Sequence, residues 1–231
     1  MPKAENKRIL LLPVLSDTKL NISKQKIDTL LDNLVEQGWY EWPNAIPDRL
    51  CENLLAEIET YAELGDLQRA GIGQGEQHQL NNSVRRDEIK WLNGRSDSQL
   101  HYFEVMQILQ TEMNRALFLG LFEYECHYAL YPQGGFYKIH RDSFKGQANR
   151  MVTTVLYLNP GWQTDWGGEL VLYNDEQTKQ IARISPELGK MVIFMSEQIP
   201  HEVLPTQQPR ASIAGWFRLN TTTAGVIDPP R

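Results

Sequence analysis

The sequence predicts an α+β fold that is mostly β: a double-sheet jelly roll with N-terminal helices packed on one sheet. Up to about residue 119 the apolar residues recur at helical spacing, whereas beyond it they recur at every second position in short runs. The run 149–158 is apolar on both faces, so helices must cover one face and a second sheet the other. We therefore expect a single domain over residues 1–231, with a helical support at about 20–119 and a jelly-roll core at 120–220.

The composition fits a soluble enzyme of one domain. The chain has 231 residues, of which 41% are hydrophobic, enough to bury a full core. The net charge of −6 disfavours a nucleic acid partner, because phosphate contacts need a basic surface. Cys51 and Cys126 stand far apart and are expected to be buried thiols in a reducing, cytoplasmic compartment. The apolar run 9–15 is short and carries a proline, so we expect a strand there rather than an export signal or a membrane span.

Three helices are expected before residue 119, where the apolar residues change from helical spacing to every second position. The first begins after Ser23, a good N-cap, and ends at Gly38; Pro47 opens the second; the third runs from about Asp97 to Leu119. A strand-like segment, 39–42, lies between the first two. The predicted inward residues are Ile27, Leu30, Leu31 and Leu34, then Leu50, Leu54, Ile58 and Tyr61, then Leu100, Phe103, Met106, Leu109, Met113 and Leu117.

Eight short runs with a period of two follow the helices. They are separated by glycine, proline, asparagine and aspartate, which favour turns, and the doublet Gly167-Gly168 is expected to form a turn or bulge at a strand start. The runs are 122–131, 135–142, 149–158, 168–173, 179–184, 190–195, 200–205 and 210–219.

Three residues in these runs are typical of a metal site. His140 and Asp142 are two apart, so on a strand both side chains leave the same face, and His201 follows after several further strands. Two imidazoles and one carboxylate leave coordination positions open, as in the facial triad of non-haem Fe(II) oxygenases. A catalytic zinc site remains an alternative on these residues alone. Arg210 and Ser212 share one strand face further along, where the guanidinium fork can bind a carboxylate.

At these positions the chain resembles the 2-oxoglutarate/Fe(II)-dependent oxygenases, most of all a bacterial-type homologue in the prolyl hydroxylase domain branch, whose members include the hypoxia-inducible factor prolyl hydroxylases. The resemblance covers roughly residues 27–220, including an upstream stretch at 69–91. The similar segments are Tyr-Pro-Gln-Gly-Gly-Phe-Tyr-Lys-Ile-His-Arg-Asp (131–142), Leu-Tyr-Leu-Asn (156–159), Gly-Gly-Glu-Leu (167–170), Pro-His-Glu-Val (200–203) and the stretch 210–216.

The resemblance implies a double-stranded β-helix and a dioxygenase that uses Fe(II), 2-oxoglutarate and O2, with ascorbate as a further candidate. By resemblance, Arg210 and Tyr157 bind the distal carboxylate of 2-oxoglutarate, and Tyr131 lies near its other end. Ser212 either contacts the same carboxylate or is merely buried. The family pattern has a threonine where this chain has Ala214, so part of the pocket wall differs.

The resemblance further implies hydroxylation of a prolyl residue in an extended segment of a protein, with release of succinate and CO2. We expect the protein to be a monomer, although the sequence itself does not determine the oligomeric state. We expect a mobile finger-like hairpin at 71–91, whose Arg85 and Asp87 contact the polypeptide, while Tyr137, Arg150 and Trp216 shape the proline pocket. A hydroxylase of small molecules or free amino acids and a catalytically silent metal-binding sensor are the alternatives. His127 either lines the pocket or is a core histidine, whereas His78 and His101 are assigned to the surface.

Overall fold

The computed structural model describes residues 22–71, 83–143 and 149–220. The apolar run 9–15, His78 and most of the expected finger hairpin lie outside the described residues. Within them, the helices are α1 (Lys24–Glu36), α2 (Asp48–Glu63) and α3 (Asp97–Leu117), and residues Thr164–Trp166 form one turn of 3-10 helix. The strands are β1 (Trp39–Trp42), β2 (Gln68–Arg69), β3 (Glu88–Trp91), β4 (Leu121–Tyr131), β5 (Tyr137–His140), β6 (Arg150–Tyr157), β7 (Leu170–Tyr173), β8 (Gln180–Ile184), β9 (Met191–Met195), β10 (His201–Val203) and β11 (Arg210–Leu219).

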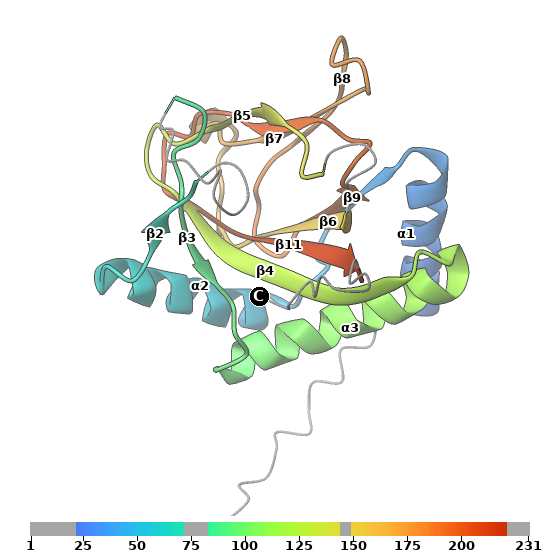
Figure 1. Cartoon of the computed structure of the whole chain (residues 1–231). Helices are drawn as coiled ribbons and strands as arrows, with labels where there is room; N and C mark the ends of the chain where they lie inside the picture. Colours follow the sequence, from blue (N-terminus) through green and yellow to red (C-terminus); the bar gives the residue numbers. More distant parts are fainter. Residues whose placement is uncertain (1–21, 72–82, 144–148, 221–231) are drawn as a thin grey trace, which may run out of the picture.

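The strands form two antiparallel sheets that lie one above the other (Figure 1). The large sheet has the order β1-β9-β6-β11-β4-β3-β2, and the small sheet has the order β5-β10-β7-β8. Each of the eight predicted runs contains a strand, β4 to β11. The α+β, mostly β jelly roll is therefore confirmed, with β1, β2 and β3 extending the large sheet at its two edges.

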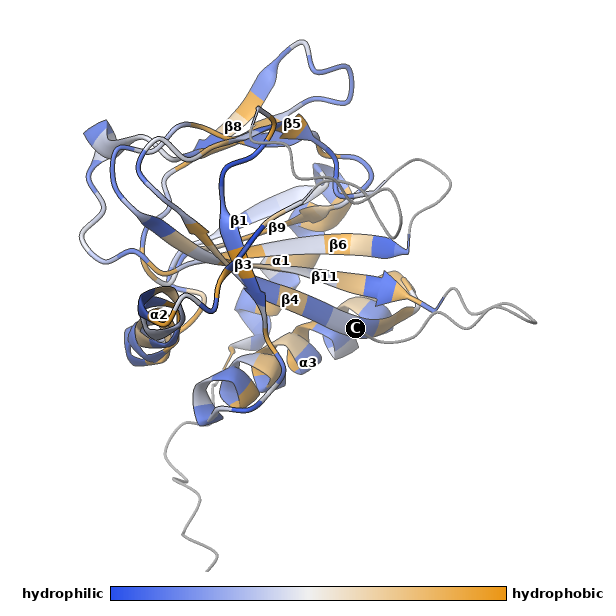
Figure 2. Ribbon diagram, turned by 60° about the vertical axis from the view of Figure 1, so that its left-hand side comes forward, coloured by the Kyte–Doolittle hydropathy of each residue, from blue (hydrophilic) through white to orange (hydrophobic). Residues whose placement is uncertain are grey.

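All three helices cover the outer face of the large sheet, as Figure 2 shows from a second direction. Ser23 caps α1 by accepting a hydrogen bond from the backbone N–H of Lys26, and Ser96 caps α3 in the same way from Gln99. Among the described residues, no helix is both long and apolar enough to cross a bilayer.

The prediction for the inner face of α3 is partly wrong. Leu100 is 49% exposed, and the buried positions include Tyr102 and Val105, which the sequence analysis left out. Met106, Leu109 and Met113 are buried as expected. The buried face of α3 is therefore rotated slightly about the helix axis relative to the predicted face. In this orientation the phenol oxygen of Tyr102 lies 2.9 Å from that of Tyr124 on β4.

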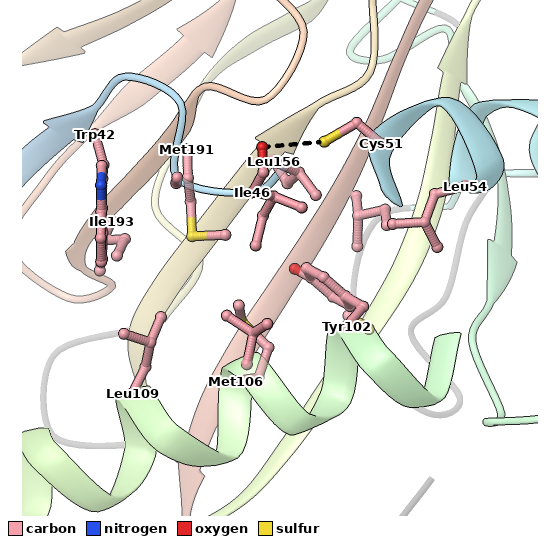
Figure 3. Close-up of a cluster of buried hydrophobic side chains, with 14 of the residues drawn as sticks. Trp42, Ile46, Cys51, Leu54, Tyr102, Met106, Leu109, Leu156, Met191 and Ile193 are labelled. Atoms are coloured by element: carbon pink, nitrogen blue, oxygen red, sulfur yellow. Dashed lines mark hydrogen bonds between the residues drawn. The ribbon is translucent and has the colours of Figure 1, made fainter. Parts of the chain in front are cut away.

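Two hydrophobic cores lie on the two faces of the large sheet. The first fills the space between the helices and this sheet, where Leu54, Met106 and Leu156 meet (Figure 3). The second lies between the two sheets and includes Tyr131, Tyr157 and Phe194. Burial on both faces explains why β6 reads as an almost continuous apolar run, and the space between the sheets is where the predicted site residues converge.

Candidate metal centre and its pocket

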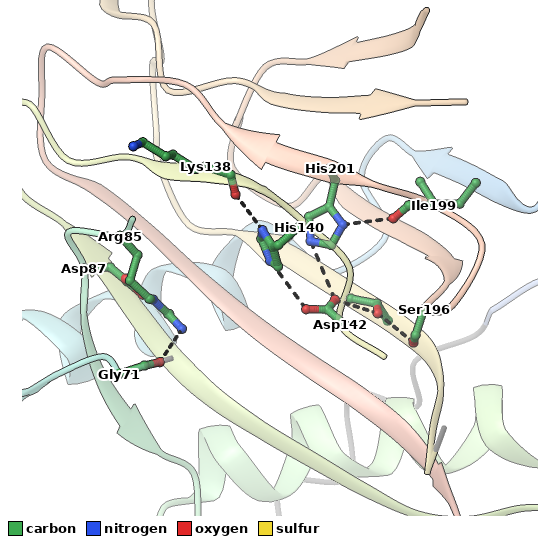
Figure 4. Close-up of polar contacts among 10 residues, drawn as sticks. Gly71, Arg85, Asp87, Lys138, His140, Asp142, Ser196, Ile199 and His201 are labelled. Carbon is green, nitrogen blue, oxygen red and sulfur yellow. Dashed lines mark hydrogen bonds and ion pairs between the residues drawn. The ribbon is translucent and has the colours of Figure 1, made fainter. Parts of the chain in front are cut away.

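His140, Asp142 and His201 come together at one end of the small sheet (Figure 4). His140 is the last residue of β5, His201 is the first of β10, and the two are paired across these antiparallel strands. Nε2 of His140 lies 3.6 Å from Oδ1 of Asp142, and Nε2 of His201 lies 3.6 Å from Oδ2. The three ligand atoms lie within 4.8 Å of one another, so they could hold one metal ion.

Asp142 is not on the strand as predicted, because β5 ends at His140 and Asp142 lies in the bend that follows. Its orientation comes from a side chain of the other sheet. Thr153 on β6 donates a hydrogen bond of 2.8 Å from Oγ1 to Oδ2 of Asp142, and Ser196 Oγ lies 2.8 Å from Thr153 Oγ1. Because the Thr153 hydroxyl hydrogen goes to the carboxylate, Ser196 must be the donor to Thr153.

Both histidines are oriented by backbone carbonyls. Nδ1 of His140 lies 2.8 Å from the Lys138 carbonyl oxygen, and Nδ1 of His201 lies 3.1 Å from that of Ile199. A carbonyl only accepts, so each Nδ1 carries the hydrogen and each Nε2 presents a lone pair toward Asp142.

The charges at this cluster also suit a divalent metal. Burial alone would raise the pKa of the Asp142 carboxyl, but His201 and His140 lower it well below its usual range. Burial, reinforced by the neighbouring His140, lowers the pKa of His201 to about 4. At neutral pH the carboxylate is therefore ionised and His201 is neutral, the states in which both groups bind metals.

Arg210 forms a buried cationic anchor at the start of β11. It is 1% exposed, and its guanidinium donates from Nε to the Gly168 carbonyl at 2.8 Å and from Nη1 to Ser212 Oγ at 3.2 Å. The Nη2 of Arg210 and the Oη of Tyr157 are buried without a hydrogen-bond partner among the described residues. The Arg210 Cζ lies 5.0 Å from the ring centroids of both Tyr131 and Tyr157. A buried cation with an unused donor is costly unless an anion binds it, so these groups fit a carboxylate ligand.

Gly167 and Gly168 make this anchor possible through their backbone. Both have positive φ, 68° and 71°, as the predicted turn at the start of β7 requires. A Cβ on Gly168 would lie 3.2 Å from Cδ of Arg210. Glycine at this position therefore lets the Gly168 carbonyl accept the Nε hydrogen bond of Arg210.

One cavity of about 220 Å³ contains both the metal cluster and the cationic anchor. His140 reaches solvent with 17% of its side chain exposed, whereas Arg210 is enclosed. The cavity is also lined by Tyr131, Ser212 and Ala214. A ligand that chelates a metal at one end and carries a carboxylate at the other would fit between the two groups.

Four of the five predicted substrate contacts line the same cavity: Arg85, Tyr137, Arg150 and Trp216. Arg85 lies 4.3 Å from the ring centroid of Tyr137, which stacks on His140 at 3.5 Å. Arg150 lies 3.7 Å from the ring centroid of Trp216 and is held by Glu125, with an Nε to Oε1 distance of 2.9 Å.

Asp87, the fifth, is buried and binds Arg85 through two hydrogen bonds of 2.7 and 2.5 Å. Arg85 also donates to the Gly71 carbonyl at 3.3 Å (Figure 4). Asp87 thus fixes the Arg85 guanidinium at the cavity.

His127, left open by the sequence, is both buried and part of the cavity wall. Its ring packs against both Trp91 and Trp216, with centroid distances of 5.2 and 5.3 Å. Burial, with the nearby Arg85 adding to it, lowers the pKa of His127 to about 4. His101 lies on α3, away from this cavity.

Thr153, Ser196 and Trp91 were not among the residues that the sequence predicted for the site. Thr153 carried a signal, because it is a polar residue on the same face of β6 as Tyr157. Ser196 and the orienting carbonyls of Lys138 and Ile199 gave none, since a backbone carbonyl is the same for every residue type.

Comparisons with known proteins agree with this geometry. The sequence pattern of the 2OG-Fe(II) oxygenase superfamily matches residues 126–218. Mouse (Mus musculus) prolyl 3-hydroxylase OGFOD1 is 37% identical over 86 residues, which are 34% of this chain and 15% of that relative, so the match spans only a small part of the relative's length.

Two solved structures are similar over most of the chain. A Pseudomonas putida prolyl-4-hydroxylase is 37% identical, with a TM-score of 0.77 over 83% of this chain and 98% of that one. A Trichoplax adhaerens prolyl hydroxylase, solved with a peptide of the hypoxia-inducible factor oxygen degradation domain, is 26% identical, with a TM-score of 0.75 over 84% of this chain and 89% of that one. The chain therefore belongs to the 2OG-Fe(II) oxygenase superfamily.

Proposed function

We propose that the protein is a 2-oxoglutarate- and O2-dependent Fe(II) dioxygenase that hydroxylates a prolyl residue in a protein substrate and releases succinate and CO2. The observation that carries this proposal is the single cavity that contains both an open His-Asp-His cluster and a buried arginine with an unused donor. The similar Pseudomonas putida and Trichoplax adhaerens structures are prolyl hydroxylases, which supports the choice of substrate class.

In this proposal His140, Asp142 and His201 are the catalytic metal ligands. Bound Fe(II) supplies the oxygen chemistry that couples decarboxylation of 2-oxoglutarate to hydroxylation of a C–H bond. The donor set fits Fe(II), because two imidazoles and one carboxylate leave positions for the cosubstrate. The carbonyls of Lys138 and Ile199 orient the two imidazoles through Nδ1, so that each Nε2 faces the metal position, and Thr153 fixes the Asp142 carboxylate.

Arg210 and Tyr157 would bind the distal carboxylate of 2-oxoglutarate, because Arg210 lines the cavity, the Tyr157 ring lies beside its guanidinium, and Nη2 and Oη are buried without a hydrogen-bond partner among the described residues. Ser212 would hold the guanidinium in place through its 3.2 Å hydrogen bond, and Tyr131 would form the adjacent wall. The enclosed position of these groups excludes water, which strengthens the ion pair.

The small volume of the cavity favours a polypeptide substrate over a small molecule. The cavity volume of about 220 Å³ lies below the roughly 300 Å³ at which small-molecule sites begin. We infer that one prolyl side chain occupies the open end of the cavity beside the bound 2-oxoglutarate. Arg85, Tyr137, Arg150 and Trp216 would contact that side chain and its neighbours, while the rest of the segment lies outside.

The decisive experiment is intact-mass analysis of lysate proteins and synthetic prolyl peptides incubated with the protein, Fe(II), ascorbate and 2-oxoglutarate. We expect one target to gain the mass of one oxygen atom, with fragmentation placing it on a proline. The Asp142→Ala variant serves as the matched control. Succinate formation stimulated only by free amino acids or other small molecules would instead support the small-molecule hydroxylase. No succinate under any condition would support the metal-binding sensor.

The remaining expectations are also proposals. We propose that the chain is a single domain, acts as a monomer in the cytoplasm, and uses ascorbate to keep its iron reduced. Cys51 and Cys126 are free and buried, as a reducing compartment allows. The net charge of −6 supports the absence of a nucleic acid partner. Size-exclusion chromatography with light scattering tests whether the protein is a monomer in solution.

A further inference from the structure

The turn between β9 and β10, residues 196–199, is linked by hydrogen bonds to two ligands of the metal cluster, to His201 directly and to Asp142 through Thr153. Ser196 binds Thr153, which binds Asp142, in a chain of two 2.8 Å hydrogen bonds. The carbonyl of Ile199 accepts the Nδ1 hydrogen of His201 at 3.1 Å (Figure 4). The first and last residues of the turn therefore orient two of the three ligands.

The two middle residues of this turn bind Arg141, which stands between the ligands His140 and Asp142 in the sequence. Arg141 donates from Nη1 to the Glu197 carbonyl at 2.8 Å and to the Gln198 carbonyl at 2.7 Å. Nη2 donates to the backbone carbonyl of Asp175 at 2.6 Å, in the turn between β7 and β8, and to the Asp175 Oδ1 at 2.7 Å. One guanidinium thus connects the end of β5 to two other turns.

The 196–199 turn does not depend on Arg141 for its own shape. The backbone N–H groups of Gln198 and Ile199 both donate to the Met195 carbonyl, at 3.1 and 3.2 Å, and that of Ser196 donates to the Met151 carbonyl at 3.0 Å. These bonds close the turn on itself and fasten it to β6. Beyond His140, however, β5 has ended, so the ladder between β5 and β10 no longer fixes Asp142.

We propose that Arg141 is a positioning residue of the metal centre, which ties the end of β5 to the 196–199 turn and thereby fixes His140 and Asp142 relative to His201. This inference rests on the proposed metal site. Groups that orient metal ligands contribute about 10- to 100-fold to metal affinity. The rigid fork of arginine suits this role, because it binds three carbonyls of two turns at once.

The direction in which metal affinity changes on replacing Arg141 distinguishes a positioning role from an effect of its charge. Arg141 is a cation near a site for a cation, so if its charge mattered most, removing it would strengthen metal binding by relieving repulsion. If its geometry matters most, removing it weakens metal binding. Arg141→Lys keeps the charge and loses the fork, so the positioning role predicts weaker binding for this variant as well.

The test measures Mn(II) binding to the metal-free, full-length protein by the electron paramagnetic resonance signal of the free ion. We expect Arg141→Met to raise the Kd for Mn(II) about 10- to 100-fold and Arg141→Lys to raise it by a smaller factor. Arg115→Met is the matched control. The side chain of Arg115 on α3 is 68% exposed and pairs with Glu112, so the Kd of this variant for Mn(II) should equal that of the wild type.

A Kd for Arg141→Met that is equal to or below the wild-type value would overturn the inference and leave the metal site intact. A wild-type protein that binds no Mn(II) would overturn both this inference and the proposed metal site. A merely structural role would lower the unfolding temperature of the metal-free variant without changing the Kd of the folded protein, and this result also counts against the inference. If Arg141→Met does not fold, Asp175→Ala, which removes one of the four acceptors, must still weaken Mn(II) binding.

Discussion

Replacing Arg210 with methionine should separate 2-oxoglutarate binding from metal binding. Methionine fills much of the same volume, but it removes the guanidinium that would pair with the distal carboxylate. Arg210 is 1% exposed, and no carboxylate among the described residues forms an ion pair with it. The ligand is therefore the expected counter-ion of this buried charge.

The expected magnitude follows from that burial. Breaking a buried ion pair by removing one partner costs about 3–5 kcal/mol. At about 1.4 kcal/mol for each tenfold change, the Kd for 2-oxoglutarate should rise by roughly 100- to 1,000-fold or more. The ligand-free variant should still fold, because two effects on its stability oppose each other. It loses the hydrogen bonds of Arg210 to Gly168 and Ser212, but it also loses a buried Nη2 that has no partner, and such unpaired groups cost about 1–3 kcal/mol.

Isothermal titration of 2-oxoglutarate into the Mn(II)-loaded protein measures this change directly. Wild-type protein should also gain thermal stability on adding 2-oxoglutarate, since a ligand that binds only the folded state stabilises it, and Arg210→Met should lose that gain. Mn(II) affinity without 2-oxoglutarate should be unchanged. A folded Arg210→Met variant with a wild-type Kd for 2-oxoglutarate would refute the assignment of Arg210 as the anchor.

Three further predictions concern residues that line the cavity or lie beside Arg210. Asp142→Ala should abolish succinate formation and Mn(II) binding while the far-UV circular dichroism stays as in the wild type, because a ligand is lost and core volume is not; retained turnover would remove Asp142 from the metal site. Tyr157→Phe should raise the Kd for 2-oxoglutarate about 10- to 100-fold, the equivalent of the roughly 1.5–3 kcal/mol of a hydrogen bond to a charged group, without destabilising the ligand-free protein; titration calorimetry and thermal unfolding check the two halves. His127 has its pKa lowered to about 4 in the folded state, against about 6.5 when unfolded. The unfolded chain therefore binds more protons in this window, and stability is lost as the pH falls from 6.5 toward 4. His127→Phe should remove about 2–3 kcal/mol of the acid destabilisation between pH 7 and pH 4.5, measured by urea unfolding at both values, and an unchanged pH dependence would contradict the buried neutral state.

The sequence was informative where the type of residue at a position directly reflects what that position requires, such as burial or a ligand atom. Val152 and Leu156 lie on one face of β6, and Val155 and Tyr157 lie on the other. Apolar residues on both faces predicted that both faces of this strand are covered. His140, His201 and Arg210 were found because residues of these types at these spacings form a combination that is specific enough to indicate ligand-binding residues.

The sequence was uninformative where the backbone or a distant turn supplies the contact. The inward face of α3 was misjudged at Leu100, because hydrophobicity alone does not decide between neighbouring rotations of a helix about its axis. Asp142 leaves its strand, and its partners Thr153 and Ser196 come from β6 and the turn after β9. Such contacts depend on which segments meet in three dimensions, which no local period encodes.

The division of the site between the two sheets has a mechanical consequence. His140 and His201 belong to the small sheet, whereas Arg210, Tyr157 and Tyr131 belong to the large sheet that the helices support. A cosubstrate held by a metal at one end and by Arg210 at the other would therefore connect the small sheet to the large sheet. Loading the cavity should therefore slow amide hydrogen exchange in β5 and β10 as well as in β11, and the small sheet would be free to shift again each time succinate departs.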